Sequence, residues 1–419
     1  MNKIIIEGKH ELAGEIAVKG AKNSALKVLP AVILSSKPIT ISNLPEIEDV
    51  KLSLDILQDI GATIEQTNGT YKIHLPEVKK NQLDPKFVNK FRASIVFVGP
   101  ILARTGEVFF QHPGGCVIGA GKRPIDIFLD GLIQFGAELT EENGFYRLAA
   151  KKLKACTYFF TTISVTATET MMMTAVLAEG TTVLKNCACE PEIPFLANYL
   201  NQQGAKITGA GTPTMVIEGV KSISAGNITI MPDRIETGTF AILAAASNSH
   251  FHITNCIPEH VESLLSIFHK IGVRWQAGAD WLEILPSKLT GSYGIKTHEY
   301  PGFPTDLQSP YTVLATQCPG SCIIHETIYD RRLLYTDMLT QMGADIIMCD
   351  PHRVVVSGPT ELYGHKLTSP DLRAGIGMII AGLIANGKTE IDNIYQIDRG
   401  YEQIDTRLKT LGANITRVE

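Results

Sequence analysis

A step of the form Gly-Ala-x-Ile, with small variations, recurs six times along the chain at intervals of 68 to 75 residues. Its copies begin at Gly61, Gly136, Gly204, Gly272, Gly343 and Gly412. Each copy follows a short amphipathic segment, such as 52–60 or 404–411, and precedes a strand-like segment. Glycine here is typical of a helix C-cap, because it adopts the positive φ that turns the chain out of a helix. The pattern therefore predicts six helix–glycine–strand junctions.

A second feature lies between these steps and recurs in the same phase. It is a largely apolar helical segment that leads through a short turn into a β-branched strand. The six turn-and-strand segments are 35–41, 104–108, 179–183, 247–253, 319–324 and 386–391. A helix that is apolar on all sides is buried, so we expect these six helices to form the domain cores.

The length of the repeated unit constrains the architecture. A unit of about 70 residues is too long for a solenoid repeat of 20 to 50 residues. A chain of 419 residues is also too long for one ordinary core. The sequence therefore predicts an α/β protein of two domains, each built from three units.

Composition excludes several classes of protein. The net charge of −5 argues against a general nucleic-acid binder. The first seven residues have no long apolar region like that of a secretory signal, and the longest apolar run, 377–385, is far shorter than the roughly 18 residues of a membrane span. The eight cysteines show no metal-ligand spacing. We expect a cytoplasmic protein with reduced thiols, no metal or other cofactor, and no nucleic-acid or membrane partner; its oligomeric state is not predicted.

The first turns of the six apolar helices carry polar and basic residues. These turns are Lys22–Ser24, Arg92–Ser94, Ser164–Thr166, Arg234–Thr237, Pro304–Asp306 and Asp371–Arg373. Ser164 and Asp371 suit helix caps. Capping does not explain Lys22, Arg92 or Arg373, because a cation at a helix N-terminus opposes the macrodipole. Unless a carboxylate pairs with each cation, these residues indicate a bound anion.

One cysteine lies in a setting unlike the others. Cys116 follows two glycines, and Gly119, Gly121, Lys122 and Arg123 come after it. The glycines favour a loop, and basic neighbours lower the pKa of a thiol from its free value of about 8.5 and hold anions. The segment is interpreted as a reactive thiol beside an anion site, with an ordinary glycine-rich turn as the alternative.

The expected substrate is small and carries several negative charges. The sequence contains no Walker loop or Rossmann fingerprint in context, so side chains rather than a glycine cradle would hold its phosphates. Pro124, just after the thiol segment, suits the first position of a helix that continues to residue 133.

Together these residues resemble the UDP-N-acetylglucosamine 1-carboxyvinyltransferase family of enolpyruvyl transferases. The resemblance runs end to end and rests on the motifs Gly20–Asn23, Phe91–Ser94, Pro113–Cys116, Arg123–Asp126, Leu177–Thr182, Glu190–Glu192, Pro232–Gly238, Phe303–Asp306, Asp371–Arg373 and Ile397–Tyr401. It implies two inside-out α/β barrel domains, each of three βαβαββ repeats. Residues 22–231 would form the domain with the thiol loop, and 1–21 with 232–419 the second, with the active site in the cleft between them.

By this resemblance the chain would transfer the enolpyruvyl group of phosphoenolpyruvate to the 3-hydroxyl of UDP-N-acetylglucosamine, releasing phosphate, in an addition followed by an elimination. Cys116 would deliver a proton to the methylene carbon, and could form a covalent adduct. Asp306 would act near the 3-hydroxyl as base and anchor. Phosphoenolpyruvate would be held by its phosphate at Lys22, Arg123 and Arg399, and near its carboxylate by Arg332 and Arg373. The residues implied to be catalytic are Cys116, Asp306, Arg399 and Lys22.

The resemblance also implies a sugar-nucleotide site. Asn23 would position the tetrahedral intermediate. The UDP-sugar positions are Arg92, Arg123, Pro124, Ile125, Asp126, Ile127, Thr162, Ile163, Ser164, Val165 and Ile328. The thiol loop is two residues longer than the common form, so Lys122 could share the role of Arg123, and Thr166 stands where many members have glycine. Two alternatives are 3-phosphoshikimate 1-carboxyvinyltransferase and a non-catalytic paralogue that binds UDP-sugar.

Overall fold

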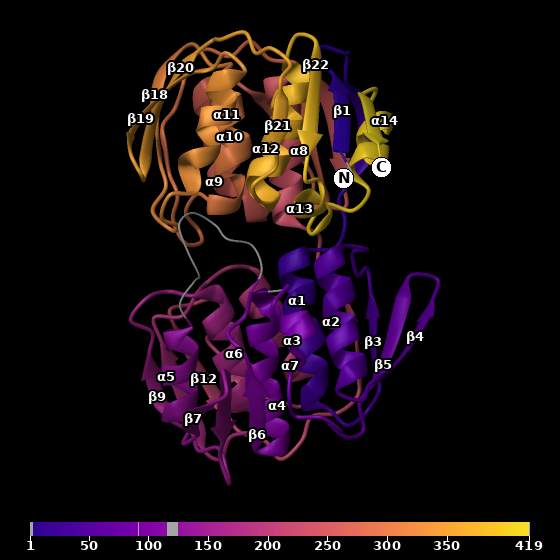
Figure 1. The fold of residues 1–419 in the computed structure, drawn as a ribbon, viewed down its shortest axis with the longest axis vertical. Helices are drawn as coiled ribbons and strands as arrows, with labels where there is room; N and C mark the ends of the chain where they lie inside the picture. The colour runs from indigo at the N-terminus through magenta and orange to yellow at the C-terminus, as the bar shows by residue number, and fades with distance from the viewer. Residues whose placement is uncertain (1–2, 91, 115–124, 419) are drawn as a thin grey trace. The chain divides into compact units, whose positions relative to one another are not determined.

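The chain folds into two compact units, which the computed structural model describes over residues 3–90, 92–114 and 125–418 (Figure 1). We call residues 20–114 and 125–231 the central unit. We call residues 3–19 and 232–418 the terminal unit, because it contains both ends of the chain. Each unit has its own hydrophobic core.

The central unit begins with a helix and alternates helices with short strands. Its helices are α1 (Lys22–Ala31), α2 (Glu48–Asp59), α3 (Pro85–Val88), α4 (Val98–Thr105), α5 (Asp126–Gln134), α6 (Val165–Val176) and α7 (Glu192–Gln202), with 3-10 turns at Val32–Leu34 and Arg92–Phe97. Its strands are β3 (Ile39–Ser42), β4 (Thr63–Thr67), β5 (Thr70–His74), β6 (Glu107–Phe110), β7 (Glu138–Glu142), β8 (Phe145–Ala149), β9 (Thr157–Phe159), β10 (Thr181–Lys185), β11 (Lys206–Thr208), β12 (Thr214–Glu218) and β13 (Gly226–Thr229).

The terminal unit follows the same plan. Its helices are α8 (Arg234–Ala246), α9 (Glu262–Ile271), α10 (Gln308–Ala315), α11 (Thr336–Gln341), α12 (Leu372–Ile384), α13 (Tyr395–Asp398) and α14 (Ile404–Thr410), with 3-10 turns at Pro258–Val261, Thr305–Leu307 and Arg332–Tyr335. Its strands are β1 (Lys3–Glu7), β2 (Ala13–Ala17), β14 (His250–Thr254), β15 (Arg274–Ala277), β16 (Trp281–Leu285), β17 (Ile295–Lys296), β18 (Gly320–His325), β19 (Asp345–Asp350), β20 (Arg353–Gly358), β21 (Lys366–Thr368), β22 (Lys388–Asp392) and β23 (Asn414–Val418).

The predicted glycine junctions are confirmed. At all six positions φ is positive, between 86° at Gly272 and 114° at Gly61. The junctions join α2 to β4, α5 to β7, α7 to β11, α9 to β15, α11 to β19 and α14 to β23. A side chain with a Cβ rarely adopts this backbone conformation, which explains why glycine recurs at each junction.

The predicted burial of the apolar helices is also confirmed. All thirteen residues of α12 and all eight of α10 are buried, and α8 is buried from Arg234 to Ala245. Figure 1 shows these three helices inside the terminal unit with strands around them. In the central unit α1, α4 and α6 hold the same place, so each unit is an inside-out α/β barrel with helices in its core.

Two predicted helices begin differently from expectation. The segment that starts at Arg92 is a 3-10 turn before it becomes α4, and the segment at Thr305–Leu307 is a 3-10 turn before α10. Each α-helix carries a proline in its first turn, Pro100 or Pro310. Proline has no N–H to donate to the residue four positions earlier, so a continuous α-helix would be interrupted there.

The sheets show how the repeats close. In the described chain, five of the six sheets have four strands. In each of them one edge strand runs parallel to its neighbour and the other neighbouring strands are antiparallel, as in β9-β10-β12-β11. The N-terminal strands complete the terminal unit, because β1 lies between β22 and β23 and β2 pairs with β14. The central unit closes when β13 pairs with β3. No described helix is long and apolar enough to cross a membrane.

Candidate active site

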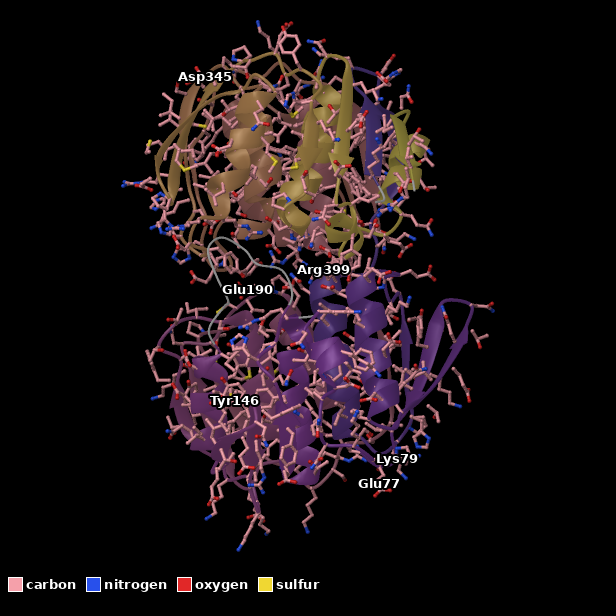
Figure 2. The ribbon with its side chains drawn as sticks, viewed as in Figure 1. Glu77, Lys79, Tyr146, Glu190, Asp345 and Arg399 are labelled. Carbon is pink, nitrogen blue, oxygen red and sulfur yellow. The ribbon has the colours of Figure 1, made fainter. Side chains whose placement is uncertain are left out.

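The predicted site residues fall into two groups, one in each unit. The central unit holds Lys22, Asn23, Arg92, Ile125, Asp126, Ile127, Thr162, Ile163, Ser164 and Val165, and the terminal unit holds Asp306, Ile328, Arg332, Arg373 and Arg399. Cys116, Arg123 and Pro124 lie outside the described residues. Figure 2 shows Glu190 at the end of the central unit where α1 begins, and Glu77 and Lys79 toward the opposite end.

Asp306 is the centre of the group in the terminal unit. Its Oδ2 accepts a hydrogen bond from Arg373 at 2.8 Å, and its Oδ1 accepts one from Arg332 at 3.1 Å. The aspartate lies in the turn before α10, and the arginines lie in the first turn of α12 and before α11. One carboxylate thus connects three elements of the repeat.

Charge, more than burial, sets the protonation state of this carboxylate. Burial by itself raises the pKa of Asp306, but the neighbouring guanidinium groups of Arg373 and Arg332 outweigh it and hold this pKa well below its usual range. The two arginines are 6% and 4% exposed, whereas the Asp306 side chain is 25% exposed. Asp306 is therefore an ionised, partly accessible acceptor placed between two buried cations.

A second carboxylate, Glu326, is linked to the same cluster by hydrogen bonds. Glu326 is fully buried, and its Oε1 accepts hydrogen bonds from the backbone of Ile328 at 2.8 Å and Tyr329 at 3.0 Å. Its Oε2 accepts one from the Thr305 hydroxyl, which in turn accepts one from Arg332 at 2.6 Å. Sequence reasoning missed Glu326, whose only signal was a carboxylate directly after a predicted strand.

Arg399 follows α13 and is buried. Its Nη1 donates to Gln396 Oε1 at 3.3 Å. The adjacent carboxylate, Asp398, forms its ion pair with Arg417 at 2.8 Å. Figure 2 labels Arg399 at one end of the terminal unit and Asp345 at the other.

Carboxylate partners, which the sequence left open, are present for the helix-end cations Lys22 and Arg373. Lys22 pairs with Asp49 at 2.7 Å, and Arg373 pairs with Asp306. The position of these cations therefore does not by itself require a bound anion. An incoming carboxylate or phosphate would have to share or replace these partners.

The first turns of α1 and α6 carry the polar groups of the central unit. The Ser164 hydroxyl caps α6 by accepting from Ala167 N at 3.2 Å, as predicted. In contrast, α1 has no side-chain cap. Lys27 instead donates to the carbonyl of Asn23 at 3.1 Å and forms an ion pair with Glu169 in α6 at 3.0 Å. The sequence signal for this missed pair was a charged residue inside each of two apolar runs.

Other possible sites are not supported by the described part of the chain. Among the residues with defined positions, no group of three or more His, Cys, Asp or Glu side chains could hold a metal ion. A hollow of about 250 Å³ beside β11 and β12, lined by Asn201, Lys206 and Glu218 among others, includes none of the predicted site residues. The clusters around Asp306 and at the first turn of α1 remain the candidates.

The lowered pKa of Asp306 predicts how stability depends on pH. A carboxyl whose pKa is lowered on folding stabilises the folded state above its unfolded pKa, near 3.8, and loses that contribution as the pH falls toward the folded value. We therefore expect the difference in unfolding free energy between wild type and Asp306→Asn to stay constant from about pH 8 to 5 and to shrink below about pH 4. Urea unfolding at a series of pH values measures it. A difference that already closes between pH 7 and 5 would contradict the lowered pKa.

Comparison with known sequences finds a matching family model and relatives along the full length of the chain. The family model of EPSP synthase (3-phosphoshikimate 1-carboxyvinyltransferase) matches residues 6–408. The UDP-N-acetylglucosamine 1-carboxyvinyltransferase of Desulforapulum autotrophicum is 42% identical over 419 residues, with 100% of both chains covered. UDP-N-acetylglucosamine 1-carboxyvinyltransferase 2 of Oceanobacillus iheyensis is 43% identical over 419 residues, covering 100% of this chain and 97% of its own.

Solved structures show the same fold. The enolpyruvyl transferase NikO from Streptomyces tendae matches with a TM-score of 0.89 at 23% identity, covering 100% of this chain and 99% of its own. An EPSP synthase from Acinetobacter baumannii matches with a TM-score of 0.76 at 17% identity, with 100% of both chains covered. At these identities the likeness concerns the fold alone.

Proposed function

The chain belongs to the enolpyruvyl transferase family, and we propose that it transfers the enolpyruvyl group of phosphoenolpyruvate to the 3-hydroxyl of UDP-N-acetylglucosamine, with release of phosphate. The observation that carries this proposal is the 42% identity, over the full length of both chains, to a UDP-N-acetylglucosamine 1-carboxyvinyltransferase. The EPSP synthase with the same fold is only 17% identical.

The proposed reaction has two steps. In the addition, a proton reaches the methylene carbon of phosphoenolpyruvate while the 3-oxygen of the sugar bonds to the adjacent carbon and gives up its proton. In the elimination, a proton leaves the new methyl group and the C–O bond to phosphate breaks, which restores the double bond. Cys116 is the proposed donor of the first proton, because a thiol beside two basic residues and several glycines suits a reactive role.

The Asp306 cluster supports substrate-binding roles for side chains of the terminal unit. Arg332 and Arg373 present guanidinium groups suited to bidentate contact with the carboxylate of phosphoenolpyruvate. Asp306, already ionised, would accept a hydrogen bond from the 3-hydroxyl and orient it. A carboxylate with a lowered pKa is a weak base, but an anionic substrate that engages the two arginines would weaken their hold on Asp306 and raise its basicity. Arg399 would contact the phosphate.

The central unit would hold the sugar nucleotide and the intermediate. The first turn of α1 supplies Lys22 and Asn23, and the capped first turn of α6 supplies Ser164 and Val165. We also propose domains of 22–231 and of 1–21 with 232–419, whose two groups of side chains act on the same pair of substrates. The enzyme would need no cofactor, because proton transfer and positioned cations suffice for this reaction.

If the proposed reaction holds, the protein would act in the synthesis of the bacterial cell wall. Transfer of enolpyruvyl to UDP-N-acetylglucosamine is the first committed step of peptidoglycan synthesis, on which cell shape and division depend. We propose a cytoplasmic enzyme that takes small-molecule substrates and no nucleic-acid or membrane partner. A pyruvate-derived adduct on Cys116 and inactivation by fosfomycin, a thiol-directed epoxide, would follow from the same chemistry.

Phosphate release tests the proposal directly. We expect purified protein to release phosphate from phosphoenolpyruvate when UDP-N-acetylglucosamine is present, and not when the sugar nucleotide is omitted or replaced by shikimate 3-phosphate. The physical reason is that phosphate leaves only after an acceptor oxygen has added. Release with shikimate 3-phosphate alone would identify the sister transferase. Binding of the sugar nucleotide without release would indicate a non-catalytic paralogue.

A further inference from the structure

A buried ion pair joins two core helices of the central unit. Lys27 in α1 and Glu169 in α6 lie 3.0 Å apart, and they are 6% and 0% exposed. The residues that follow Lys27 in α1 are buried and apolar, and Glu169 in α6 lies between the buried Thr168 and Thr170. Two charges in such a core lose hydration that their mutual attraction only partly replaces.

The pair contacts the turn that carries two residues of the candidate site. Lys27 Nζ also donates to the carbonyl oxygen of Asn23 at 3.1 Å, so it holds the first turn of α1 as well as Glu169. A helical side chain points toward the helix N-terminus, which explains how Lys27 reaches back by one turn. Glu169 lies one turn beyond the cap at Ser164. The pair therefore connects the turn that carries Lys22 and Asn23 with the helix that begins at the proposed sugar-nucleotide contacts.

The first turn of α1 is held by side chains from outside it rather than by a cap of its own. Ala21 at its N-cap provides no side-chain hydrogen bond, and the first turn contains no acidic residue. The α6 helix, in contrast, is capped by the Ser164 hydroxyl. An uncapped first turn that begins with a lysine is held by contacts from elsewhere. Lys22 pairs with Asp49 in α2, and Lys27 adds a hydrogen bond to the carbonyl of Asn23.

Stability is a poor explanation for the pair. Replacement of a buried ion pair by apolar residues of similar volume is often neutral or stabilising. Burial raises the pKa of Glu169 to about 7, against the lowering effect of Lys27 and with the added repulsion of Glu192 and Glu190. Close to neutral pH the Glu169 carboxyl is therefore charged in only part of the molecules. The ion pair then adds little net stability.

We propose that Lys27 and Glu169 are positioning residues that fix the first turn of α1, with Lys22 and Asn23, relative to the first turn of α6. This inference rests on the proposed function, since Asn23 is assigned to the intermediate and Ser164 to the sugar nucleotide. The pair does not touch substrate; it acts through the Asn23 backbone. Its loss should therefore misalign the reacting groups without removing the fold.

The test replaces the pair by apolar residues of similar length, Lys27→Met with Glu169→Leu. We expect a melting temperature close to that of wild type, a dissociation constant for UDP-N-acetylglucosamine within about threefold, and a fall in kcat of about 10²-fold, because displacement by about 1 Å costs this much in rate. Phosphate release, calorimetric binding and thermal unfolding measure the three quantities. A purely structural role would not separate kcat from binding and stability in this way.

Two further variants make the result specific. Glu169→Gln keeps an oxygen at the position that lies 3.0 Å from Lys27, and should keep kcat within about tenfold of wild type. The control is Lys80→Met with Asp59→Leu, which removes a 2.7 Å ion pair of the same unit and should change neither kcat nor binding. If the apolar double variant does not fold, Lys27→Met with Glu169→Gln is measured by the same criteria.

The outcomes distinguish this inference from the proposed function. Absence of transfer by the wild-type protein would overturn the function, and the positioning role with it. Transfer by the wild type together with an unchanged kcat in the apolar double variant would overturn the positioning role alone. A loss of sugar-nucleotide binding as large as the loss of kcat would also contradict it.

Discussion

A Cys116→Ala variant is expected to release phosphate about 10²-fold to 10⁴-fold more slowly than wild type near neutral pH. This factor is the usual contribution of a general acid. Alanine has no proton to deliver to the methylene carbon, so the addition step should fail. Cys116→Asp, in contrast, should retain measurable turnover, because a carboxyl group can also deliver a proton. Full activity of the alanine variant would exclude the proton-donor role.

Sensitivity to a thiol-directed epoxide such as fosfomycin provides an independent measurement. Wild type should be inactivated and alkylated at Cys116, and Cys116→Asp should be resistant. Burial raises the pKa of the thiols at Cys156 and Cys322 to about 11, and of those at Cys187, Cys256 and Cys318 to about 12, so they should not compete for the reagent. Cys349→Ala, which removes an exposed thiol, is the matched control. Inactivation of Cys116→Asp at the wild-type rate would contradict the assignment.

An Asp306→Ala variant is expected to lose both stability and activity. The substitution leaves two buried guanidinium groups without their shared carboxylate, which typically costs about 3 to 5 kcal/mol of unfolding free energy. Turnover should fall by about 10²-fold to 10⁴-fold, because the 3-hydroxyl loses its acceptor. Urea unfolding and phosphate release measure the two effects. Asp345→Ala, an exposed position on β19, is the control and should change neither.

Asp306→Asn separates two roles of this residue. Asparagine keeps an oxygen that accepts a hydrogen bond but cannot take up the proton. If Asp306 mainly orients the hydroxyl, the asparagine variant should retain clearly more turnover than the alanine variant. If it is the base, both variants should be equally inactive once they are compared under conditions where both are folded.

The local fold could be read from the sequence because its signals are local. A glycine with positive φ and the alternation of apolar helix and strand depend on residues close in the chain, and all six junctions appear as predicted. The partners of the strands could not be read in this way. The placement of β1 between β22 and β23 joins residues separated by nearly the whole chain, and no periodicity encodes such a contact.

The candidate site shows the same difference between local signals, which the sequence reveals, and contacts between distant segments, which it does not. Local patterns identified the cations at the helix starts, such as Lys22 and Arg373, and the cap at Ser164. They did not identify Asp49 as the partner of Lys22, Glu326 as the acceptor for Thr305, or Glu169 as the partner of Lys27, because each carboxylate lies on a different element from its partner. Whether a cation binds substrate or an internal carboxylate depends on these partners.

Periodicity and residue type were enough to predict the repeated α/β units, the buried helices and the chemical types of the residues at their first turns, because both signals act over a few positions. Which charges meet depends instead on how distant segments of the chain pack together. Asp306 lies between Arg332 and Arg373, and Glu169 meets Lys27, because the packing of three repeats brings distant helix starts together. Protonation states follow from that packing, since the free energy of a charge depends on the groups around it and on its loss of hydration.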